Sequence, residues 1–309
     1  MKNEIVLSII IPVYNEEKNI RLLHERLTIV LSTITDNYEI LWVNDRSNDN
    51  TLDIIKELVL SHSRNRYISL SRNFGHQKSI TAGIDKCKGK AAVIMDGDLQ
   101  DPPELIPELW KKYIEGYKVV YAKRRVRKGE SYFKKSTAAF FYRLMKKTSG
   151  VEIPLDTGDF RLINRTIIDH LKQMPEQDKF IRGQIAWIGY DQTFVLYDRQ
   201  ERLEGKTKFG FFKMLHFALD GITAFSNYPL RIVSLTGFAV SILAFIIILY
   251  ALYSKFIKDE VISGWTSLII SVLFLGGIQL ISIGIIGQYI SRINSDVRKR
   301  PLYIIEEES

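Results

Sequence analysis

Two long stretches without a charged residue lie near the C-terminal end of this 309-residue sequence. Residues 232–254 read IVSLTGFAVSILAFIIILYALYS, and residues 261–291 include TSLIISVLFLGGIQLISIGIIGQYI. A helix that crosses a membrane needs roughly 20 consecutive apolar residues, and both stretches are long enough. A pair of buried core helices is the alternative, but two runs of this length favour membrane spans. Their position late in the chain is not that of a signal peptide.

The distribution of charge predicts the orientation of these spans. The net charge of +8 belongs to residues 1–231, because residues 232–309 hold equal numbers of basic and acidic residues. The loop between the spans contains Lys255 and Lys258, whereas the flanks contain more cations: Arg231, Arg292, Arg298, Lys299 and Arg300. The positive-inside rule places both termini in the cytoplasm. We therefore expect a multi-pass protein of the inner membrane whose basic cytoplasmic domain suits anionic lipid or phosphate ligands.

The residues before the first span have an amphipathic pattern. Within 209–227 the polar positions recur at spacings of three and four, as one stripe of a helix: Lys213, His216, Asp220, Thr223 and Asn227. A helix lying on the bilayer is favoured over one packed on the soluble core, because a span follows directly. The expected organisation is a cytoplasmic domain at 1–208, a juxtamembrane helix at 209–228, spans at 229–254 and 265–291, a short extracytoplasmic loop at 255–264 and a cytoplasmic tail at 292–309.

The first 200 residues alternate between strand-like and helix-like segments. Short apolar runs rich in β-branched residues occur at 5–11, 39–44, 67–70, 91–95 and 118–122. Helix-like segments lie between them, near 16–33, 50–62, 76–87 and 103–115, the last with Pro103 where a first helical residue is tolerated. This alternation predicts an α/β fold with a mostly parallel sheet covered on both faces. Ligands bind such sheets at the carboxyl ends of the strands.

Several classes of enzyme are disfavoured by composition and motifs. A single cysteine, Cys87, excludes an intrachain disulfide and a cysteine-based zinc site. The five histidines are scattered and include no His-x-x-x-His pair, which argues against a zinc hydrolase. No G-x-G-x-x-G follows the first strand and no G-x-x-x-x-G-K-[ST] occurs, which disfavours a dinucleotide dehydrogenase and a P-loop NTPase.

Acidic residues follow three of the predicted strands, the first being the run at 5–11, which Glu16 and Glu17 follow. Asp96-Gly97-Asp98 ends the run at 91–95, and two carboxylates there are suited to hold Mg²⁺ or Mn²⁺ together with substrate phosphates. An acidic surface turn is the alternative, which the end of a buried strand disfavours. Asp45 follows the run at 39–44 and could accept hydrogen bonds from a uracil or a ribose, or could cap the next helix.

A cluster of basic residues occupies 123–135, which read KRRVRKGESYFKK. A solvated surface or a nucleic-acid patch is the usual interpretation of such a run. Aromatic residues are few and no nucleic-acid motif accompanies it, so we expect no nucleic-acid partner. Beside a membrane, a lipid phosphate is the better partner, because arginine presents a forked set of donors to phosphate.

These features together resemble the polyprenyl-phosphate glycosyltransferases, which include dolichyl-phosphate mannose synthases and bacterial bactoprenol glucosyltransferases. The matching stretches cover most of residues 1–210 in order: IIPVYNEE (10–17), VNDRSNDNT (43–51), RNFGHQKSITAG (72–83), MDGDLQDPPE (95–104), DTGDFRLINR (156–165) and RQERLEGKTKF (199–209). The two spans resemble the bacterial undecaprenyl-phosphate branch in particular. The Q-x-x-R-W motif of processive polysaccharide synthases is absent.

The resemblance implies a GT-A catalytic domain, with Rossmann-like binding of a nucleotide sugar, and an inverting transfer of one sugar to a lipid phosphate. It implies roles for the following residues: for the nucleotide sugar Pro12, Tyr14, Glu16, Asp45, Lys78, Asp96, Gln100 and Lys208; for the metal Asp96 and Asp98; for the acceptor phosphate Arg124, Lys134, Lys135 and Ser136. Arg202 lies in a segment that would close over the diphosphate, and Asp98, Asp159 and Arg202 would take part in catalysis. The implied cofactor is Mg²⁺ or Mn²⁺.

The chemistry of the acceptor limits what a catalytic base would do. A phosphate monoester has a second pKa of about 6, so it is largely a dianion at pH 7 and needs positioning more than deprotonation. Asp159 could therefore act as a base toward residual monoanion, could orient the sugar, or could be a turn residue beside Gly158.

The sugar and the assembly state are the least determined parts of this interpretation. Glucose from UDP-glucose is favoured only by the bacterial resemblance, and GDP-mannose, UDP-galactose and an amino-arabinose donor stay open. A non-catalytic assembly subunit and a nucleotidyltransferase are the alternatives from other classes. The family suggests a homo-oligomer, with a tetramer as one form, and five glycines in the spans would allow close helix packing: Gly237, Gly276, Gly277, Gly284 and Gly287.

Overall fold

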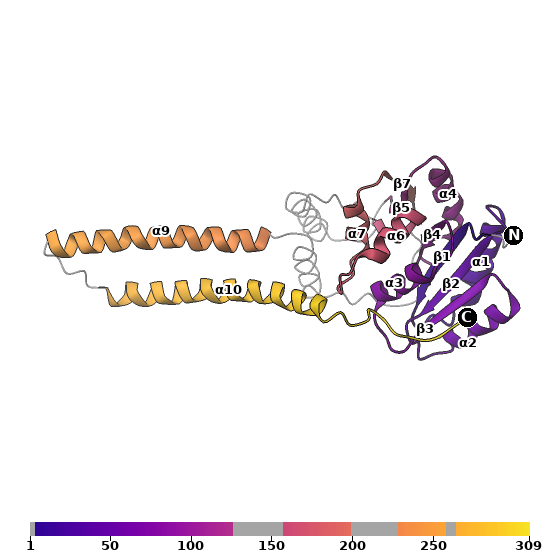
Figure 1. Ribbon diagram of the computed structural model, residues 1–309, viewed down its shortest axis with the longest axis horizontal. Coiled ribbons are helices and arrows are strands. Elements are labelled where there is room, and N and C mark those ends of the chain that lie inside the picture. The colour runs from indigo at the N-terminus through magenta and orange to yellow at the C-terminus, as the bar shows by residue number, and fades with distance from the viewer. Residues whose placement is uncertain (1–3, 126–156, 199–227, 258–263) are drawn as a thin grey trace. The chain divides into compact units, whose positions relative to one another are not determined.

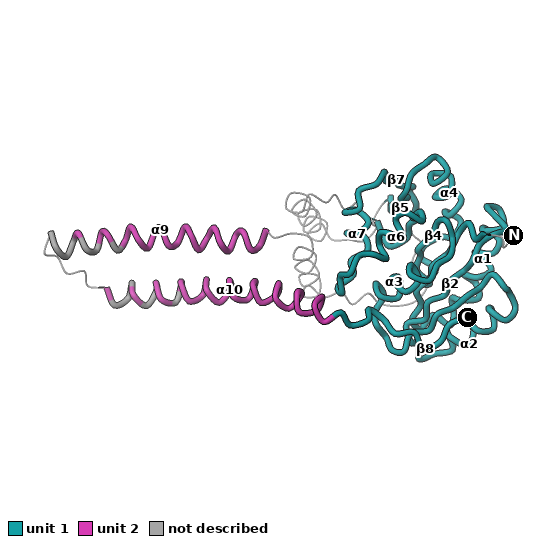
Figure 2. Tube along the Cα trace, in the orientation of Figure 1, with its two compact units in different colours: residues 1–143, 151–210, 299–309 teal, residues 144–150, 211–298 magenta. Residues whose placement is uncertain are grey.

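The computed structural model describes residues 4–125, 157–198, 228–257 and 264–309. The chain divides into two compact units, shown in Figure 2. The first comprises Met1–Arg143, Val151–Gly210 and Lys299–Ser309, and the second comprises Leu144–Gly150 and Phe211–Arg298. Each unit is described separately below.

The first unit is built on an eight-stranded sheet in the order β7-β5-β6-β4-β1-β2-β3-β8. Figure 1 labels several of these strands and the helices beside them. The strands are β1 (Leu7–Val13), β2 (Tyr38–Asn44), β3 (Asn65–Leu70), β4 (Ala91–Ile94), β5 (Val119–Arg124), β6 (Thr157–Asn164), β7 (Gln192–Tyr197) and β8 (Ile305–Glu308). The helices are α1 (Ile20–Ser32), α2 (Thr51–Ser61), α3 (His76–Lys86), the 3₁₀ turn η1 (Pro103–Leu105), α4 (Ile106–Ile114), α6 (Arg165–Gln173) and α7 (Ile181–Ile188).

Strands β1 to β4 form the parallel centre that the sequence predicts. β1 pairs in parallel with β2 and β4, and β2 pairs in parallel with β3. Every residue of β1 is buried, which is typical of a strand covered on both faces. Because side chains alternate along a strand, Ile9 and Ile11 pack with α1, α2 and α4 in one core cluster, whereas Ile10 packs with α3, α6 and α7 in the other.

β6 is a buried strand that the apolar runs did not indicate. It lies antiparallel to both neighbours, with Arg161 opposite Ile94 of β4 and opposite Tyr121 of β5. Its sequence, TGDFRLIN, is buried throughout although it contains an aspartate and an arginine. Its polar residues break the apolar pattern, and this explains why periodicity alone missed it.

β8 lies within residues 292–309, for which the sequence predicts only a tail. It pairs antiparallel with the edge strand β3, and Ser71 N–H donates to Ile304 O at 2.9 Å. Three acidic side chains of β8 make ion pairs with basic residues: Glu306 with Arg46, Glu307 with Lys56 and Glu308 with Lys86. Residues 305–308 therefore cover an edge that would otherwise present unpaired backbone groups.

The second unit contains α9 (Tyr228–Ile257) and α10 (Trp265–Val297), which contact each other. By length and composition, Tyr228–Ile247 and Phe274–Val297 are long and apolar enough to cross a membrane. A pair of soluble core helices would be buried, but none of the residues in these two windows is buried. The expected amphipathic helix at 209–228 lies almost entirely outside the described residues.

We expect β8 to stabilise the first unit through its backbone pairing. A chain ending at Leu302 should lose these hydrogen bonds, melt roughly 10 °C lower, and associate through the exposed edge of β3. The control replaces Glu306, Glu307 and Glu308 with glutamine, which keeps the strand and removes only surface ion pairs worth about 1 kcal/mol or less each. Thermal unfolding in detergent measures both, and a truncated chain that melts with the full-length protein would contradict this role.

Candidate functional site

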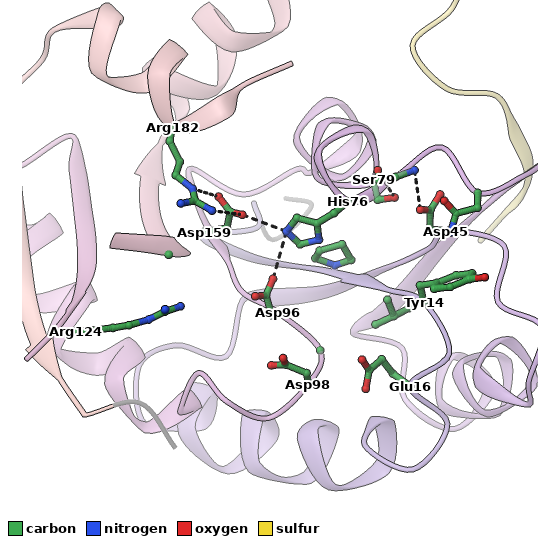
Figure 3. Close-up of a pocket in the computed structure, with 16 residues that line it drawn as sticks. Tyr14, Glu16, Asp45, His76, Ser79, Asp96, Asp98, Arg124, Asp159 and Arg182 are labelled. Atoms are coloured by element: carbon green, nitrogen blue, oxygen red, sulfur yellow. Dashed lines mark hydrogen bonds and ion pairs between the residues drawn. The ribbon is translucent and has the colours of Figure 1, made fainter. Parts of the chain in front are cut away.

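A pocket of about 570 Å³ opens at the carboxyl ends of the central strands. Eight of the residues singled out from the sequence line it: Pro12, Tyr14, Glu16, Asp45, Asp96, Asp98, Arg124 and Asp159. The parallel pairing of β1 with β2 and β4 brings their ends to one edge of the sheet, as Figure 3 shows for the side chains. The structure thus gathers residues that are up to 147 positions apart in the sequence, from Pro12 to Asp159.

Other predicted residues lie elsewhere. Lys78 is on the first turn of α3 and does not line the pocket. Gln100 does not line it either, although its backbone N–H donates to Asp98 Oδ1 at 3.1 Å and so helps to hold that side chain. The remaining five lie outside the described residues: Lys134, Lys135, Ser136, Arg202 and Lys208.

Asp45 joins the end of β2 to the start of α3. Its Oδ1 accepts the N–H of Phe74 at 2.7 Å and its Oδ2 accepts that of Gly75 at 2.9 Å. Gly75 has φ of +95°, a conformation that glycine adopts without a steric penalty. Burial raises the pKa of Asp45, against the effect of these hydrogen bonds. Asp45 therefore fastens two loops of the pocket and is not the cap of α2, a position that Asn50 occupies.

The loop after β1 is fastened in the same way. Glu16 N–H donates to Thr51 Oγ1 at 2.8 Å, and Asn15 N–H donates to Ser47 Oγ at 3.0 Å. In return, Asn48 N–H donates to Asn15 Oδ1 at 2.8 Å. The loops that follow β1 and β2 thus form one wall of the pocket, in which Tyr14 is exposed and available to a flat ring.

Asp96 is a partly exposed carboxylate with a buried Oδ1, in a negatively charged neighbourhood. Burial, together with Asp101, Asp159 and Asp98, raises its pKa to about 7 against the opposing charge of His76. Asp96 Oδ1 has no hydrogen-bond partner among the described residues and only an ion pair with His76 Nε2 at 3.4 Å. A bound cation would stabilise the ionised form of this carboxylate.

The donor set at this position fits a hard divalent ion. Asp96 and Asp98 offer carboxylate oxygens, and substrate phosphates complete the coordination in typical magnesium sites. In the described part of the chain, no group of three or more His, Cys, Asp or Glu residues could hold a metal without such help. Gly97 keeps the two aspartates close to β1, because a Cβ there would lie 2.8 Å from Val13 Cγ1.

Asp159 is held by a network that the sequence did not reveal. Arg182 donates to both of its oxygens, from Nε at 2.9 Å and from Nη2 at 3.2 Å. His76 Nε2 and Gln77 Nε2 lie 3.2 and 3.3 Å from Oδ2, and Arg161 Nη2 lies 3.4 Å from Oδ1. Dashed lines in Figure 3 mark the contacts of Asp159 with Arg182 and His76.

The charges around Asp159 keep it ionised. Burial alone would raise its pKa, but the hydrogen bond from His76 and the charges of Arg182 and Arg161 hold the pKa well below its usual range. Conversely, burial would lower the pKa of His76, and the contacts with Asp159 and Asp96 raise it. With both oxygens already engaged, the geometry favours a carboxylate that orients its neighbours, and its service as a base stays a prediction.

Among the lining residues that the sequence analysis did not predict, His76 and Arg182 make ion pairs in the pocket. His76 lay inside the RNFGHQKSITAG motif without a role, and that motif was the signal that could have found it. Arg182 follows Asp159 by 23 residues, in a segment with no recognised pattern, and α7 alone brings it to the pocket.

Residues 8–172 match the model of glycosyl transferase family 2. The chain is also 48% identical over 307 residues to the uncharacterized glycosyltransferase YkcC of Bacillus subtilis, which covers 99% of this chain and 95% of that protein. The chain belongs to glycosyl transferase family 2. The chain is a glycosyltransferase, and its mixed sheet has the expected GT-A-like fold. The resemblance inferred from the motifs is confirmed by relatives that are named bactoprenol glucosyl transferases.

Other members of the family are similar over nearly their whole length. The prophage bactoprenol glucosyl transferase homolog of Escherichia coli is 40% identical, over 97% of this chain and 98% of that protein. The bactoprenol glucosyl transferase of Shigella phage SfII is 38% identical, over 97% of both. A solved structure, glucosyl-3-phosphoglycerate synthase of Mycobacterium tuberculosis, aligns over 72% of this chain and 78% of that one, with a TM-score of 0.48 and 14% identity.

We expect Asp159→Asn to destabilise the protein, because Arg161 is fully buried and would lose its counter-charge. Breaking such a pair costs about 3 kcal/mol, which corresponds to a melting temperature roughly 6–12 °C lower at pH 7. The pKa of Asp159 is lower in the folded protein than its usual value of 3.8. The stabilisation that ionised Asp159 provides is therefore fully present above pH 3.8 and is lost as the pH falls through the folded pKa. The difference in melting temperature between wild type and variant should therefore narrow at pH 3.

Thermal unfolding in detergent at both pH values checks this expectation. A difference that is absent at pH 7, or that widens in acid, would contradict the proposed charge balance.

Proposed function

We propose that this glycosyltransferase moves one hexose from a nucleotide sugar to a polyprenyl phosphate, with inversion of the anomeric centre. The favoured donor is UDP-glucose and the favoured acceptor is undecaprenyl phosphate. The observation that carries the proposal is a single pocket with Asp96 and Asp98 in it and the guanidinium of Arg124 at its edge. Relatives named as bactoprenol glucosyl transferases support the class of acceptor and the sugar.

The donor would occupy the wall formed by the loops after β1 and β2. Pro12, Tyr14 and Asp45 line it and would contact the nucleoside, with Glu16 nearby. Asp96 and Asp98 would hold Mg²⁺ or Mn²⁺, which when bound neutralises the charge of a diphosphate leaving group. Arg202 and Lys208, by resemblance, would close over the diphosphate.

The acceptor would enter from the side of Arg124. Arg124 would hold its phosphate together with Lys134, Lys135 and Ser136, which are implied by resemblance. A phosphate oxygen then forms a bond to the anomeric carbon on the face opposite the diphosphate, and the bond from that carbon to the diphosphate oxygen breaks. The dianion has no proton to lose, so the site has chiefly to align the reactants. Asp159 would keep His76 and Arg182 in place beside the reacting centre.

The pairing of β8 with β3 supports the proposed membrane topology. Residues before α9 and residues after α10 belong to one sheet, so they lie on the same side of any membrane that the two helices cross. Two crossings satisfy this condition. Together with the flanking positive charges, this supports an inner-membrane protein with both termini in the cytoplasm. We further propose that it forms a homo-oligomer, with a tetramer as the expected form.

A transfer assay with purified full-length protein tests the function. With undecaprenyl phosphate, Mg²⁺ or Mn²⁺ and a panel of labelled nucleotide sugars, we expect label from UDP-glucose in a lipid-extractable product with β geometry from an α donor. Transfer from GDP-mannose, UDP-galactose or an amino-arabinose donor would keep the reaction and replace the sugar. A folded protein that forms no lipid product from any donor would refute the proposal in favour of a non-catalytic assembly subunit.

The metal site is tested by Asp98→Ala. Loss of a cation that stabilises several kcal/mol of transition-state charge should reduce transfer by at least about 100-fold. Asp53→Ala, on the first turn of α2 and outside the pocket, is the matched control. Binding of Mn²⁺ measured by electron paramagnetic resonance should disappear in Asp98→Ala and persist in Asp53→Ala. Undiminished transfer in excess chelator would rule out the metal.

A further inference from the structure

The guanidinium of Arg124 lies against a residue without a side chain. A Cβ placed on Gly158 of β6 would be 3.1 Å from Arg124 Nη2 and 3.9 Å from its Cζ. Gly158 has no positive φ, so backbone conformation does not require glycine here. Close approach of another group is a common reason for glycine in a strand. The space that Gly158 leaves is therefore the space that Arg124 uses.

Tyr197 contacts the same side chain from the other neighbouring strand. It is the residue opposite Arg124 in the parallel pairing of β5 with β7, and Arg124 Nε lies 3.4 Å from its hydroxyl. The Tyr197 ring is buried and packs edge-on against Phe160, with centroids 6.0 Å apart and planes at 86°. The position of the hydroxyl is therefore set by packing on β6 as well as by β7.

The Tyr197 hydroxyl donates its proton to Asp101. The distance to Asp101 Oδ1 is 2.7 Å, and Asp101 is 1% exposed. With that proton committed, the hydroxyl oxygen can only accept from Arg124 Nε, so the direction of both hydrogen bonds is determined. Burial, reinforced by Asp101, raises the pKa of Tyr197, and the phenol keeps its proton at neutral pH.

This series of contacts connects the aspartate loop at the end of β4 with Arg124 at the end of β5. Asp101 follows the Asp96-Gly97-Asp98 turn by three residues, whereas Arg124 ends β5. We propose that Gly158, Tyr197 and Asp101 are positioning residues that hold the Arg124 guanidinium for the acceptor phosphate and tie it to the aspartate loop. The inference rests on the proposed function in one respect, namely that Arg124 is a ligand of that phosphate.

Tyr197→Phe removes the hydroxyl and keeps the ring. We expect it to raise the KM for undecaprenyl phosphate and the Kd for farnesyl phosphate by about 3- to 10-fold, the range for one hydrogen bond. The KM for the nucleotide sugar should not change. Tyr121→Phe is the matched control, since Tyr121 is also a buried phenol on β5 that bonds across to β7, at Gln192. It should stay within about twofold of wild type.

A double-mutant cycle separates positioning from general stability. Arg124→Ala should weaken farnesyl phosphate binding in full-length protein, and adding Tyr197→Phe to it should cause less than about a twofold further loss. Gly158→Ala, which crowds the guanidinium from β6, should show the same pattern and provides a second variant should one fail to fold. Calorimetric titration with UDP present measures binding, and thermal unfolding checks folding.

The outcomes distinguish this inference from the function on which it rests. Three results would overturn the inference: Tyr197→Phe weakens farnesyl phosphate binding equally with and without Arg124, Tyr121→Phe weakens it as much as Tyr197→Phe does, or folded Tyr197→Phe and Gly158→Ala bind as tightly as wild type. A wild-type protein that does not bind farnesyl phosphate would also overturn it. Coupled binding losses in a protein that transfers no sugar would support it and refute the proposed function.

Discussion

The antiparallel pairing of β6 between β4 and β5 is the constraint on which the geometry of the site depends. Hydrogen bonds on both sides set Arg161 opposite Ile94 and Tyr121 at once. The same register brings Asp159 toward His76 and Asp96, and leaves Gly158 under Arg124. Since a shift of one residue would turn every side chain of the strand to the other face, the places of Asp159 and Gly158 both depend on this one backbone register.

Two carboxylates of the pocket differ in how their charge is balanced: the buried Asp159 and the partly exposed Asp96. The charge of Asp159 is balanced by Arg161 and Arg182, so this carboxyl group stays ionised. Among the described residues, the ion-pair partner of Asp96 is His76, 3.4 Å away, and the pKa of Asp96 is raised to about 7. One carboxylate therefore organises the protein, while the other favours an added positive charge. His76 contacts both and links the two roles.

The end of the chain contributes to the glycosyltransferase unit although it follows α10. β8 closes the β3 edge through backbone pairing, with acidic side chains set against Arg46, Lys56 and Lys86. Arg46 directly follows Asp45, so the tail reaches the loop that we assign to the nucleotide. The first unit therefore contains chain from before α9 and from after α10.

Local sequence determined much of this protein. Patterns and motifs predicted the buried parallel strands, the helices between them and the two apolar helices. They also predicted the family and eight residues that line the pocket, because each pattern lies within a short stretch. Tertiary structure alone decided β6, β7 and β8 and the places of Arg182 and Tyr197. Buried polar residues interrupt the apolar period of β6, and an edge strand such as β8 depends on a partner more than 230 residues away. Pairings of that kind arise only when the chain is folded.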